Sequence, residues 1–507
     1  MTHTFNLLAL DLGAESGRAI LGKFDGERLQ LSEVHRFTNG PVRLPGRQGK
    51  GSSLHWDILA LWTEILHGLG VAAQHGALAG MGLDTWGVDF GLLDKQGTLI
   101  GNPYHYRDDR TDGMLEEAFG RVPREEIFAQ TGIQFMQLNS LYQLLAMVVQ
   151  QSPALDYAHT FLTMPDLFNY WLTGRKVCEF TIATTTQCYN PIQKDWARPL
   201  LEKLGIPTHI FPEIVPPGTL LGPLSAVVAE AAGIGGIDPL GSIPVIAPAC
   251  HDTGSAVAAV PAQNPNHIWI SSGTWSLIGS TVSEPLINPQ SLGFNLTNEG
   301  GVNGTFRLLK NVTGLWLVQE CRRTWALQGQ DYSYDELTRL AEAAAPLRSL
   351  VDPDASDFLK PGDMPARMRA FCTRTGQPAP ESHGALERGA LVRIALESLA
   401  LKYRWVLEKL EVLLGRRMEV IHIVGGGTKN RLLNQLTANA TGRPVITGPV
   451  EATAIGNLLM QAIALGEIAS ADEAREIVCR SFDVETFEPA HDGDWDAAYE
   501  RLLKIIE

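Results

Sequence analysis

The chain has 507 residues, 45% of them hydrophobic, so it can bury a full globular core and is long enough for two large domains. Its formal net charge of -15 argues against a protein whose main work is binding nucleic acid or an anionic membrane surface. A phosphorylated ligand remains compatible with this charge, because backbone N–H groups and a metal ion can bind phosphate locally.

The six cysteines form no CxxC pair and show no zinc-ligand spacing, so we expect reduced and mostly buried thiols. No basic and then apolar leader precedes Asp11. No apolar run approaches the roughly 18 residues that a membrane-spanning helix needs. These features predict a cytoplasmic protein that does not cross a membrane.

The first chemical feature along the chain is the polar turn from Asp11 to Arg18, which lies between apolar runs at 7–10 and 19–22. The runs predict two strands. An acidic residue at the end of a buried strand can hold a divalent cation, and small residues let backbone N–H groups approach an anion closely. The pattern therefore favours phosphate and metal chemistry, and a plain hairpin with a polar turn is the alternative.

A helix is predicted over 56–74 from its apolar spacing, and a strand follows near 78–83. The segment Asp84–Phe90 then places two carboxylates, a hydroxyl and two aromatic rings within seven residues. A tryptophan with neighbouring polar groups is typical of a carbohydrate site. The alternative is a connection between strands that carries a core tryptophan.

Helices are predicted over 137–150 and 164–173, and an apolar strand over 243–249 leads to His251-Asp252-Thr253. A short helix is predicted to start at this polar triplet. Ligand sites favour such positions in α/β folds, and the helix dipole stabilises a carboxylate there as the anion. Asp252 could accept the proton of an attacking hydroxyl, whereas a helix N-cap at Asp252 or Thr253 is the alternative.

Beyond a candidate boundary at 261–266, the opening pattern recurs: strand 267–270, polar turn 271–274 and returning strand 275–279. An ordinary hairpin turn is again the alternative. The recurrence predicts an internal duplication of two α/β domains, 1–260 and 261–507, each opening with a phosphate-type hairpin.

The glycines 425–427 follow a predicted strand at 420–424 and precede a predicted helix near 430–439, after a long helix near 384–414. Such glycines allow close approach of the backbone to a nucleotide. The alternative is a turn that only lets strand and helix pack closely. The spacing does not match the G-x-G-x-x-G fingerprint, so a nicotinamide enzyme is disfavoured.

Taken together, these segments resemble the FGGY carbohydrate kinases, and within them the branch that acts on L-rhamnulose. The resemblance covers nearly the whole chain. DTWGVDF and SSGTWS look like that branch rather than the glycerol or xylulose kinases. The most specific segments are 84–90, 184–187, 251–253, 271–276, 298–301, 309–311, 314–317 and 422–427.

The resemblance implies two actin-like (ribonuclease-H-like) α/β domains that flank a catalytic cleft, the first binding sugar and the second nucleotide. It implies transfer of the ATP γ-phosphate to the 1-hydroxyl of L-rhamnulose, with Mg²⁺, in L-rhamnose catabolism. The expected partners are thus a small sugar and ATP, with no nucleic acid and no membrane. The chain is expected to act as a monomer or a weak homodimer.

Carried over position by position, the resemblance implies that Asp252 is the general base and also touches the sugar, and that Asp11 organises Mg²⁺ through water. It further implies a first phosphate loop at Ala14, Glu15, Ser16, Gly17 and Arg18, nucleotide contacts at Thr274, Gln319, Gly425, Gly426 and Gly427, and sugar contacts at Gly87, His251, Thr253 and Asn311. Glu15 departs from the pattern, because relatives often carry a small hydroxyl residue there.

Three other functions stay open at this point. A kinase of the same architecture could act on another ketose such as L-fuculose. A catalytically silent protein on the actin-like scaffold could respond to sugar or nucleotide, although such a sensor need not keep acidic residues at both 11 and 252. A filament-forming relative of actin would have no obvious use for the DTWG and HDT segments.

Overall fold

The computed structural model describes residues 4–46, 51–236, 243–380, 384–490 and 493–506. The chain folds into two compact units. Unit 1 comprises Met1–Pro261, Thr281–Leu308 and Ala452–Phe482, and unit 2 comprises Ala262–Ser280, Leu309–Glu451 and Asp483–Glu507.

The division differs from the single boundary that the sequence predicts. The first segment ends at Pro261, next to the expected boundary, but two later segments return to unit 1. The returning segment Ala452–Phe482 supplies two helices to unit 1, α17 (Ala452–Ala464) and α18 (Ala471–Ser481). Neither helix is among the elements predicted from the sequence, and a local pattern does not say which sheet a helix covers.

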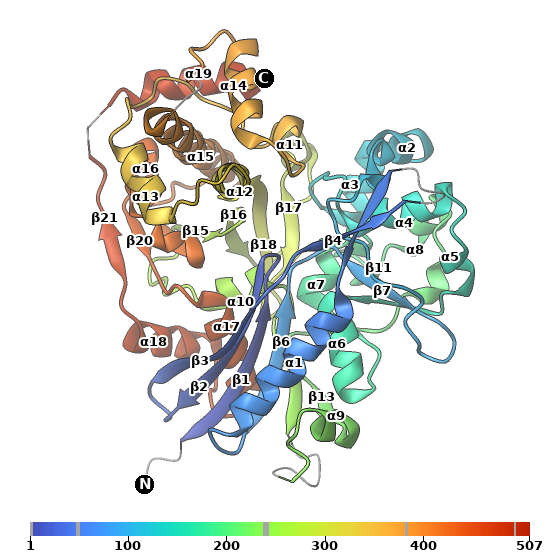
Figure 1. The fold of residues 1–507 in the computed structure, drawn as a ribbon. Coiled ribbons are helices and arrows are strands. Elements are labelled where there is room, and N and C mark those ends of the chain that lie inside the picture. Colours follow the sequence, from blue (N-terminus) through green and yellow to red (C-terminus); the bar gives the residue numbers. More distant parts are fainter. Residues whose placement is uncertain (1–3, 47–50, 237–242, 381–383, 491–492, 507) are drawn as a thin grey trace. The chain divides into compact units, whose positions relative to one another are not determined.

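Unit 1 is built on a six-stranded sheet (Figure 1). β1 pairs antiparallel with β2 and parallel with β6, and β14 continues the parallel part beyond β6. In spatial order the strands are β13 (Thr219–Pro223), β14 (Pro244–Ala247), β6 (Gly80–Thr85), β1 (Phe5–Leu12), β2 (Ser16–Phe24) and β3 (Leu29–Thr38).

Small residues let helices approach both faces of this sheet. α1 (Ile58–Ala73) packs on one face, where a Cβ on Gly68 would lie 2.9 Å from the Cβ of Ala19. α17 packs on the other face, where a Cβ on Gly82 would lie 2.5 Å from Oδ1 of Asn457. The four inner strands β1, β2, β6 and β14 are therefore mostly buried, as their apolar sequences require, whereas the edge strands β3 and β13 are partly exposed.

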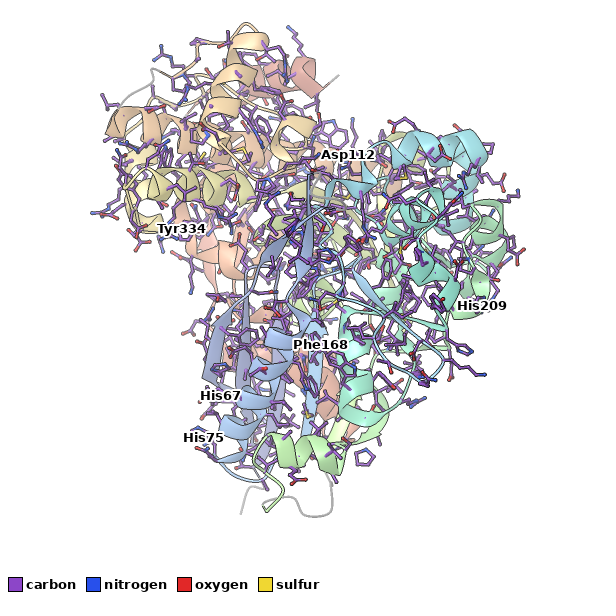
Figure 2. All side chains as sticks on the ribbon, turned by 45° about the vertical axis from the view of Figure 1, so that its right-hand side comes forward. His67, His75, Asp112, Phe168, His209 and Tyr334 are labelled. Carbon is purple, nitrogen blue, oxygen red and sulfur yellow. The ribbon has the colours of Figure 1, made fainter. Side chains whose placement is uncertain are left out.

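The remaining elements of unit 1 surround this sheet or form small sheets of their own, except β17, which neighbours β18 in the second large sheet. Figure 2 shows Phe168, which is fully buried on α6, and His67, which is exposed on α1. These elements are β4 (Pro41–Pro45), β5 (Ser52–Trp56), β7 (Phe90–Leu93), α2 (Met114–Arg121), α3 (Arg124–Thr131), α4 (Ser140–Val149), α5 (Pro153–Tyr157), β8 (Thr160–Thr163), α6 (Met164–Thr173), β9 (Cys178–Glu179), α7 (Phe180–Thr185), β10 (Tyr189–Asn190), β11 (Asp195–Trp196), α8 (Arg198–Lys203), β12 (Ile214–Val215), α9 (Ala226–Ala231), α10 (Asp252–Ala258), α11 (Pro289–Gly293) and β17 (Thr297–Gly300).

Unit 2 repeats the arrangement of unit 1. β15 pairs antiparallel with β16 and parallel with β19, β20 continues the parallel part, and β21 closes it antiparallel. This sheet has seven strands, in the spatial order β17, β18 (Phe306–Thr313), β16 (Trp275–Val282), β15 (His267–Ser272), β19 (Val420–Val424), β20 (Val445–Thr447) and β21 (Glu485–Phe487). β17 and the start of β18, as far as Leu308, are counted with unit 1.

The helices of unit 2 include the long α15, which begins and ends within one residue of its predicted bounds. They are α12 (Trp316–Leu327), α13 (Tyr334–Glu342), α14 (Met364–Arg374), α15 (Ala385–Leu414), α16 (Arg431–Thr441) and α19 (Trp495–Ile506). Because an antiparallel hairpin followed by parallel strands occurs in both units, the predicted duplication of an α/β architecture is confirmed.

Two further expectations concern the thiols and the membrane. All six cysteines are free and five of them are buried, while Cys479 is exposed. None of the helices in the described parts of the chain combines the length and the apolar character that crossing a bilayer requires.

One contact between helices is closer than any side chain would allow. A Cβ on Gly456, in the returning helix α17, would lie 1.8 Å from the carbonyl oxygen of Ser255 in α10. The backbone of α10 cannot yield as a side-chain tip can, so Gly456→Ala must push the two helices apart.

We predict that Gly456→Ala lowers the stability of the protein by about 1–3 kcal/mol, the usual cost of overpacking. The midpoint of thermal unfolding measures it. Gly120→Ala in α2 is the matched control, since a Cβ there meets open space and should be neutral or slightly stabilising. Equal midpoints for Gly456→Ala and the wild type would contradict the packing argument.

Candidate active site

The first predicted phosphate loop joins β1 to β2. Gly13 N–H donates to the carbonyl of Ser16 at 3.0 Å, which closes the turn. Asn39 holds it from outside, because its N–H donates to the carbonyl of Glu15 at 2.9 Å and its Nδ2 to that of Gly13 at 2.8 Å. The turn is thus held through the backbone carbonyls of Gly13, Glu15 and Ser16.

Asp11 and Arg18 face each other across this hairpin. They are register partners, and Arg18 Nε donates to Asp11 Oδ2 at 3.0 Å. Asp11 is buried, whereas the Arg18 side chain is 23% exposed. Arg18 therefore orients the carboxylate that the sequence assigns to the metal.

Asp84 lies beside Asp11 on the parallel neighbour strand β6. It is fully buried, Asn457 Nδ2 donates to its Oδ2 at 2.6 Å, and its Oδ1 has no hydrogen-bond partner. Burial raises the pKa of Asp84 well above its ordinary value, the charge of Asp11 raises it further, the Asn457 bond opposes the shift, and Asp252 adds to it. Asp11 and Asp252 thus both act on Asp84.

Asp252 is the first residue of α10, with His251 as the N-cap. Its Oδ1 accepts hydrogen bonds from the N–H and from Oγ1 of Thr253. Among the described residues Oδ2 has no hydrogen-bond partner, and the side chain is 30% exposed. One oxygen is therefore fixed while the other is available to a ligand, which suits a base better than a cap.

The segment before Asp252 is anchored by the buried carboxylate of Glu179. Glu179 accepts from the N–H and Oγ1 of Thr181, from Ile182 N–H, and from Cys250 N–H at 3.0 Å. His251 N–H donates to Thr181 Oγ1 at 3.2 Å. Burial raises the pKa of Glu179 to about 8 against these hydrogen bonds.

The predicted sugar segment 84–90 is tied to the same place. Thr85 N–H donates to the carbonyl of Cys250 at 2.9 Å, and Thr85 forms a parallel bridge with His251. Gly87 lies against Thr185, whose Oγ1 would be 3.2 Å from a Cβ at that position. The structure therefore brings the segments of Gly87 and of His251–Thr253 together.

Trp86 itself is only 5% exposed, as the alternative of a core tryptophan expects. Its ring lies 4.0 Å from that of Trp56, measured between centroids. Asp89 Oδ2 accepts from both indole N–H groups, at 3.1 Å from Trp86 and 2.6 Å from Trp56, and Gln143 Nε2 donates to its Oδ1 at 2.9 Å. Burial raises the pKa of Asp89 to about 6. The tryptophan pair fixes the segment rather than offering an open ring face.

His251 is enclosed by two charged side chains from 297–308. Arg307 on β18 and Glu299 on β17 both lie near its Nδ1, and its Nε2 is 3.4 Å from Asp252 Oδ1. Burial lowers the pKa of Arg307, and the charge of Glu299 and then that of Asp252 oppose the shift.

In unit 2 the predicted nucleotide residues gather around Ser272. A Cβ on Gly427 would lie 2.0 Å from Ser272 Oγ, and one on Gly425, whose φ is +87°, 3.0 Å from its carbonyl oxygen. Gly426 faces open space and is exposed, at the start of a short 3-10 helix, η5 (Gly426–Lys429). Only glycine allows this loop to lie on the β15–β16 turn.

The same turn docks on the start of α12. The carbonyl of Thr274 accepts from Gly314 N–H at 3.1 Å and from Trp316 N–H at 3.2 Å. Gln319 follows in the first turn of α12, and its Oε1 is buried without a hydrogen-bond partner. Thr274, Gln319 and the glycines therefore share one region of unit 2.

The predicted sugar residue Asn311 belongs to a different unit from the others. It lies on β18 within unit 2, whereas Gly87, His251 and Thr253 belong to unit 1.

The residues that could hold a metal ion in unit 1 are Asp11 and Asp84. In the described part of the chain no group of three or more His, Cys, Asp or Glu side chains is placed to hold a metal. Mg²⁺ usually takes one or two carboxylates and completes its shell with phosphate oxygens and water. The buried, unpartnered Oδ1 of Asp84 beside Asp11 fits such a donor set.

Two sequence profiles of one family match this chain. The N-terminal domain of the FGGY family of carbohydrate kinases matches residues 6–258, and its C-terminal domain matches 268–465. The chain belongs to this family, as its motifs predict. It is therefore a carbohydrate kinase, a phosphotransferase with a sugar and ATP as substrates.

Curated relatives cover nearly the whole chain. A rhamnulokinase of Bacteroides thetaiotaomicron is 46% identical over 495 residues, which is 97% of this chain and 98% of the relative. A rhamnulokinase of Oceanobacillus iheyensis is 40% identical over 481 residues, which is 95% of this chain and 97% of the relative.

Solved structures of other sugar kinases share the fold. Ligand-bound xylulose kinase from Lactobacillus acidophilus aligns with a TM-score of 0.77 at 17% identity over 99% of this chain and 96% of that one. Plasmodium falciparum glycerol kinase with ADP aligns at 0.75 and 16% identity over 99% and 98%. The predicted fold class of two α/β domains is confirmed.

Sequence reasoning assigned no role to several groups that hold the site. Glu179, Asn457 and Arg307 act on residues 71, 373 and 56 positions away along the chain. Arg307 is the one with a local signal, because it interrupts the apolar run Phe306–Leu309. A buried strand rarely carries a charge without a specific partner.

Asp166 on α6 supports Glu179 and gives a prediction about pH. It accepts from Glu179 N–H at 3.1 Å and from Thr163 Oγ1, and burial raises its pKa from 3.8 to about 7. The folded state therefore keeps a proton that the unfolded state releases. The stability from this group is complete below about pH 4 and is lost as pH rises through 7.

We predict that Asp166→Asn removes this pH dependence. Asparagine can accept from Glu179 N–H and donate to Thr163 Oγ1. Between pH 4 and pH 8 the free energy of unfolding should therefore fall by about 3–4 kcal/mol less in the variant than in the wild type. Urea unfolding across that range measures the difference. Asp472→Asn, at an exposed aspartate, should follow the wild type. Parallel curves for Asp166→Asn and the wild type would show that Asp166 is charged throughout.

Proposed function

We propose that this chain transfers the γ-phosphoryl group of ATP to the 1-hydroxyl of L-rhamnulose, giving L-rhamnulose 1-phosphate and ADP. The observation that carries the reaction class is Asp252, whose Oδ1 is bound by Thr253 while Oδ2 has no hydrogen-bond partner among the described residues and the side chain is 30% exposed. The choice of sugar rests on relatives named rhamnulokinase, which are 46% and 40% identical to this chain.

In the proposed reaction unit 1 binds the sugar through Gly87, His251 and Thr253. Asp252 accepts the proton as the O–H bond of the 1-hydroxyl breaks, and that oxygen bonds to the γ-phosphorus. The bond from the γ-phosphorus to the β–γ bridging oxygen breaks, and ADP leaves. In-line phosphoryl transfer depends mainly on such positioning and on neutralised charge.

The nucleotide is proposed to bind unit 2 through Thr274, Gln319 and Gly425–Gly427, with Asn311 as a further sugar contact. The loop Ala14–Arg18 is proposed to contact the phosphates, and Asp11 to hold Mg²⁺ through water, with Asp84 beside it. When bound, Mg²⁺ supplies positive charge to the phosphate oxygens. Because ATP is a substrate, we further propose that the protein works in the cytoplasm. We also propose that it acts as a monomer or a weak homodimer.

The test of the substrate is release of ADP, measured by a coupled assay, with L-rhamnulose, L-fuculose, D-xylulose and glycerol. We expect kcat/KM to be highest for L-rhamnulose, and the phosphorus NMR spectrum of the product to show a phosphate on carbon 1. If kcat/KM were highest for L-fuculose, the proposed substrate would be wrong, whereas the proposed phosphoryl transfer would stand. No turnover with any ketose, together with thermal stabilisation by a sugar, would favour a silent sensor.

We predict that Asp252→Asn lowers kcat by about 10²–10⁴-fold, the usual contribution of a general base. The amide keeps the shape of the side chain but cannot take the proton. Thermal shifts should show that the variant still binds sugar and ATP. Asp156→Asn, at an exposed position on α5, is the matched control and should keep full activity. A variant that binds both ligands and turns over normally would remove Asp252 from this role.

A further inference from the structure

Arg307 is a charged residue in the core of unit 1. Its side chain is 1% exposed, and its Nε donates to the carbonyl of Gly300 at 2.7 Å. Its Nη2 lies 3.0 Å from Nδ1 of His251 and 3.3 Å from Oε2 of Glu299, and its Nη1 is buried without a hydrogen-bond partner. A buried cation is costly unless its geometry does something that an apolar residue cannot.

The contact with His251 fixes where the imidazole proton is. A guanidinium has five N–H donors and no acceptor, so the ring nitrogen that faces it must present its lone pair. Nδ1 of His251 is therefore the acceptor, and the proton of the neutral ring sits on Nε2. That nitrogen is 3.4 Å from Oδ1 of Asp252. The ring thus turns an N–H toward the catalytic aspartate.

Glu299 is the competing influence on the ring. Its Oε2 lies 3.3 Å from Nδ1 of His251 and would favour a proton on that nitrogen. The same carboxylate oxygen is paired with Arg307 Nη2, which also makes the shorter contact with the ring. Arg307 thus donates to the lone pair of His251 Nδ1. It also pairs with Glu299, the carboxylate that would otherwise favour a proton on Nδ1.

We propose that Arg307 is a positioning residue that holds His251 as the Nε2–H tautomer, with its basic lone pair turned away from the sugar. This rests on the proposed function for the role of Asp252 as base. A neutral histidine next to a reacting hydroxyl is a natural proton acceptor. With the lone pair bound to Arg307, Asp252 is left as the acceptor, and the Nε2–H group can donate toward it.

The first readout is the tautomer itself, observed in the ligand-free full chain labelled with ¹⁵N-histidine. His251→Asn identifies which signals belong to His251. We expect the wild type to show a protonated Nε2 and an unprotonated Nδ1 at this residue. In Arg307→Met we expect the proton to move toward Nδ1, where Glu299 can accept it. A wild-type ring protonated on Nδ1 would overturn the proposal without any variant.

The second readout is kinetic. Arg307→Met should lower kcat by about 10–100-fold, part of what a well-placed base contributes, while KM for ATP stays within about twofold. Arg307→Lys should retain more activity, because an ammonium group also only donates to Nδ1. Arg198→Met, at an arginine of unit 1 that bonds the carbonyl of Thr208, is the control for loss of an arginine and should keep kcat.

The outcomes separate this proposal from the proposed function. The tautomer needs no substrate, so it stands or falls even if the enzyme prefers another ketose. A folded Arg307→Met that keeps both the wild-type tautomer and kcat would overturn the positioning role and leave Asp252 as base. If Arg307→Met does not fold, Arg307→Lys and the wild-type spectrum still decide the matter.

Discussion

The site of unit 1 depends on one buried carboxylate, that of Glu179. It accepts hydrogen bonds from the start of α7 and from the N–H of Cys250, 71 residues away. Thr181 extends the connection, because its hydroxyl donates to Glu179 and accepts from His251 N–H. The backbone that leads into Asp252 is therefore fixed by side-chain bonds to another element. A loop held only by its own turn would allow the aspartate the shifts of about 1 Å that phosphoryl transfer does not tolerate.

This anchor has an electrostatic cost. All the partners of Glu179 donate, which favours the anion, yet burial raises its pKa to about 8. Asp166 lies directly behind it, accepts its N–H, and has a pKa of about 7 for the same reason. Desolvation thus outweighs several hydrogen bonds at both positions. An apolar pair would avoid this cost, but it could not accept the N–H of Cys250 or the hydroxyl of Thr181 that in turn binds His251 N–H.

The sequence predicts what local patterns determine. Apolar periodicity and polar turns locate β1, β2, β15, β16 and α15, and the recurrence of hairpins predicts the duplicated architecture that the two sheets show. The placement of Asp252 at the start of a helix also follows from local pattern. What it cannot predict is pairing over long separations. Asn457 reaches Asp84 only because Gly456 lets α17 lie against α10, and neither contact leaves a trace in the spacing of either segment.

The same long-range contacts explain how unit 1 tolerates three aspartates in one place. Asp11 and Asp252 each raise the pKa of Asp84, and the burial of Asp84 makes that repulsion stronger than it would be in water. Arg18 compensates at Asp11, the amide of Asn457 at Asp84, and Thr253 at Asp252. Each carboxylate thus has an oxygen that accepts a hydrogen bond. The partners of Asp84 and Asp252, which are Asn457 and Thr253, are uncharged. Because burial raises the pKa of Asp84, this carboxyl favours its protonated form, which limits the negative charge beside Asp11 and Asp252. The residues that destabilise the site are thus those that give it its chemistry.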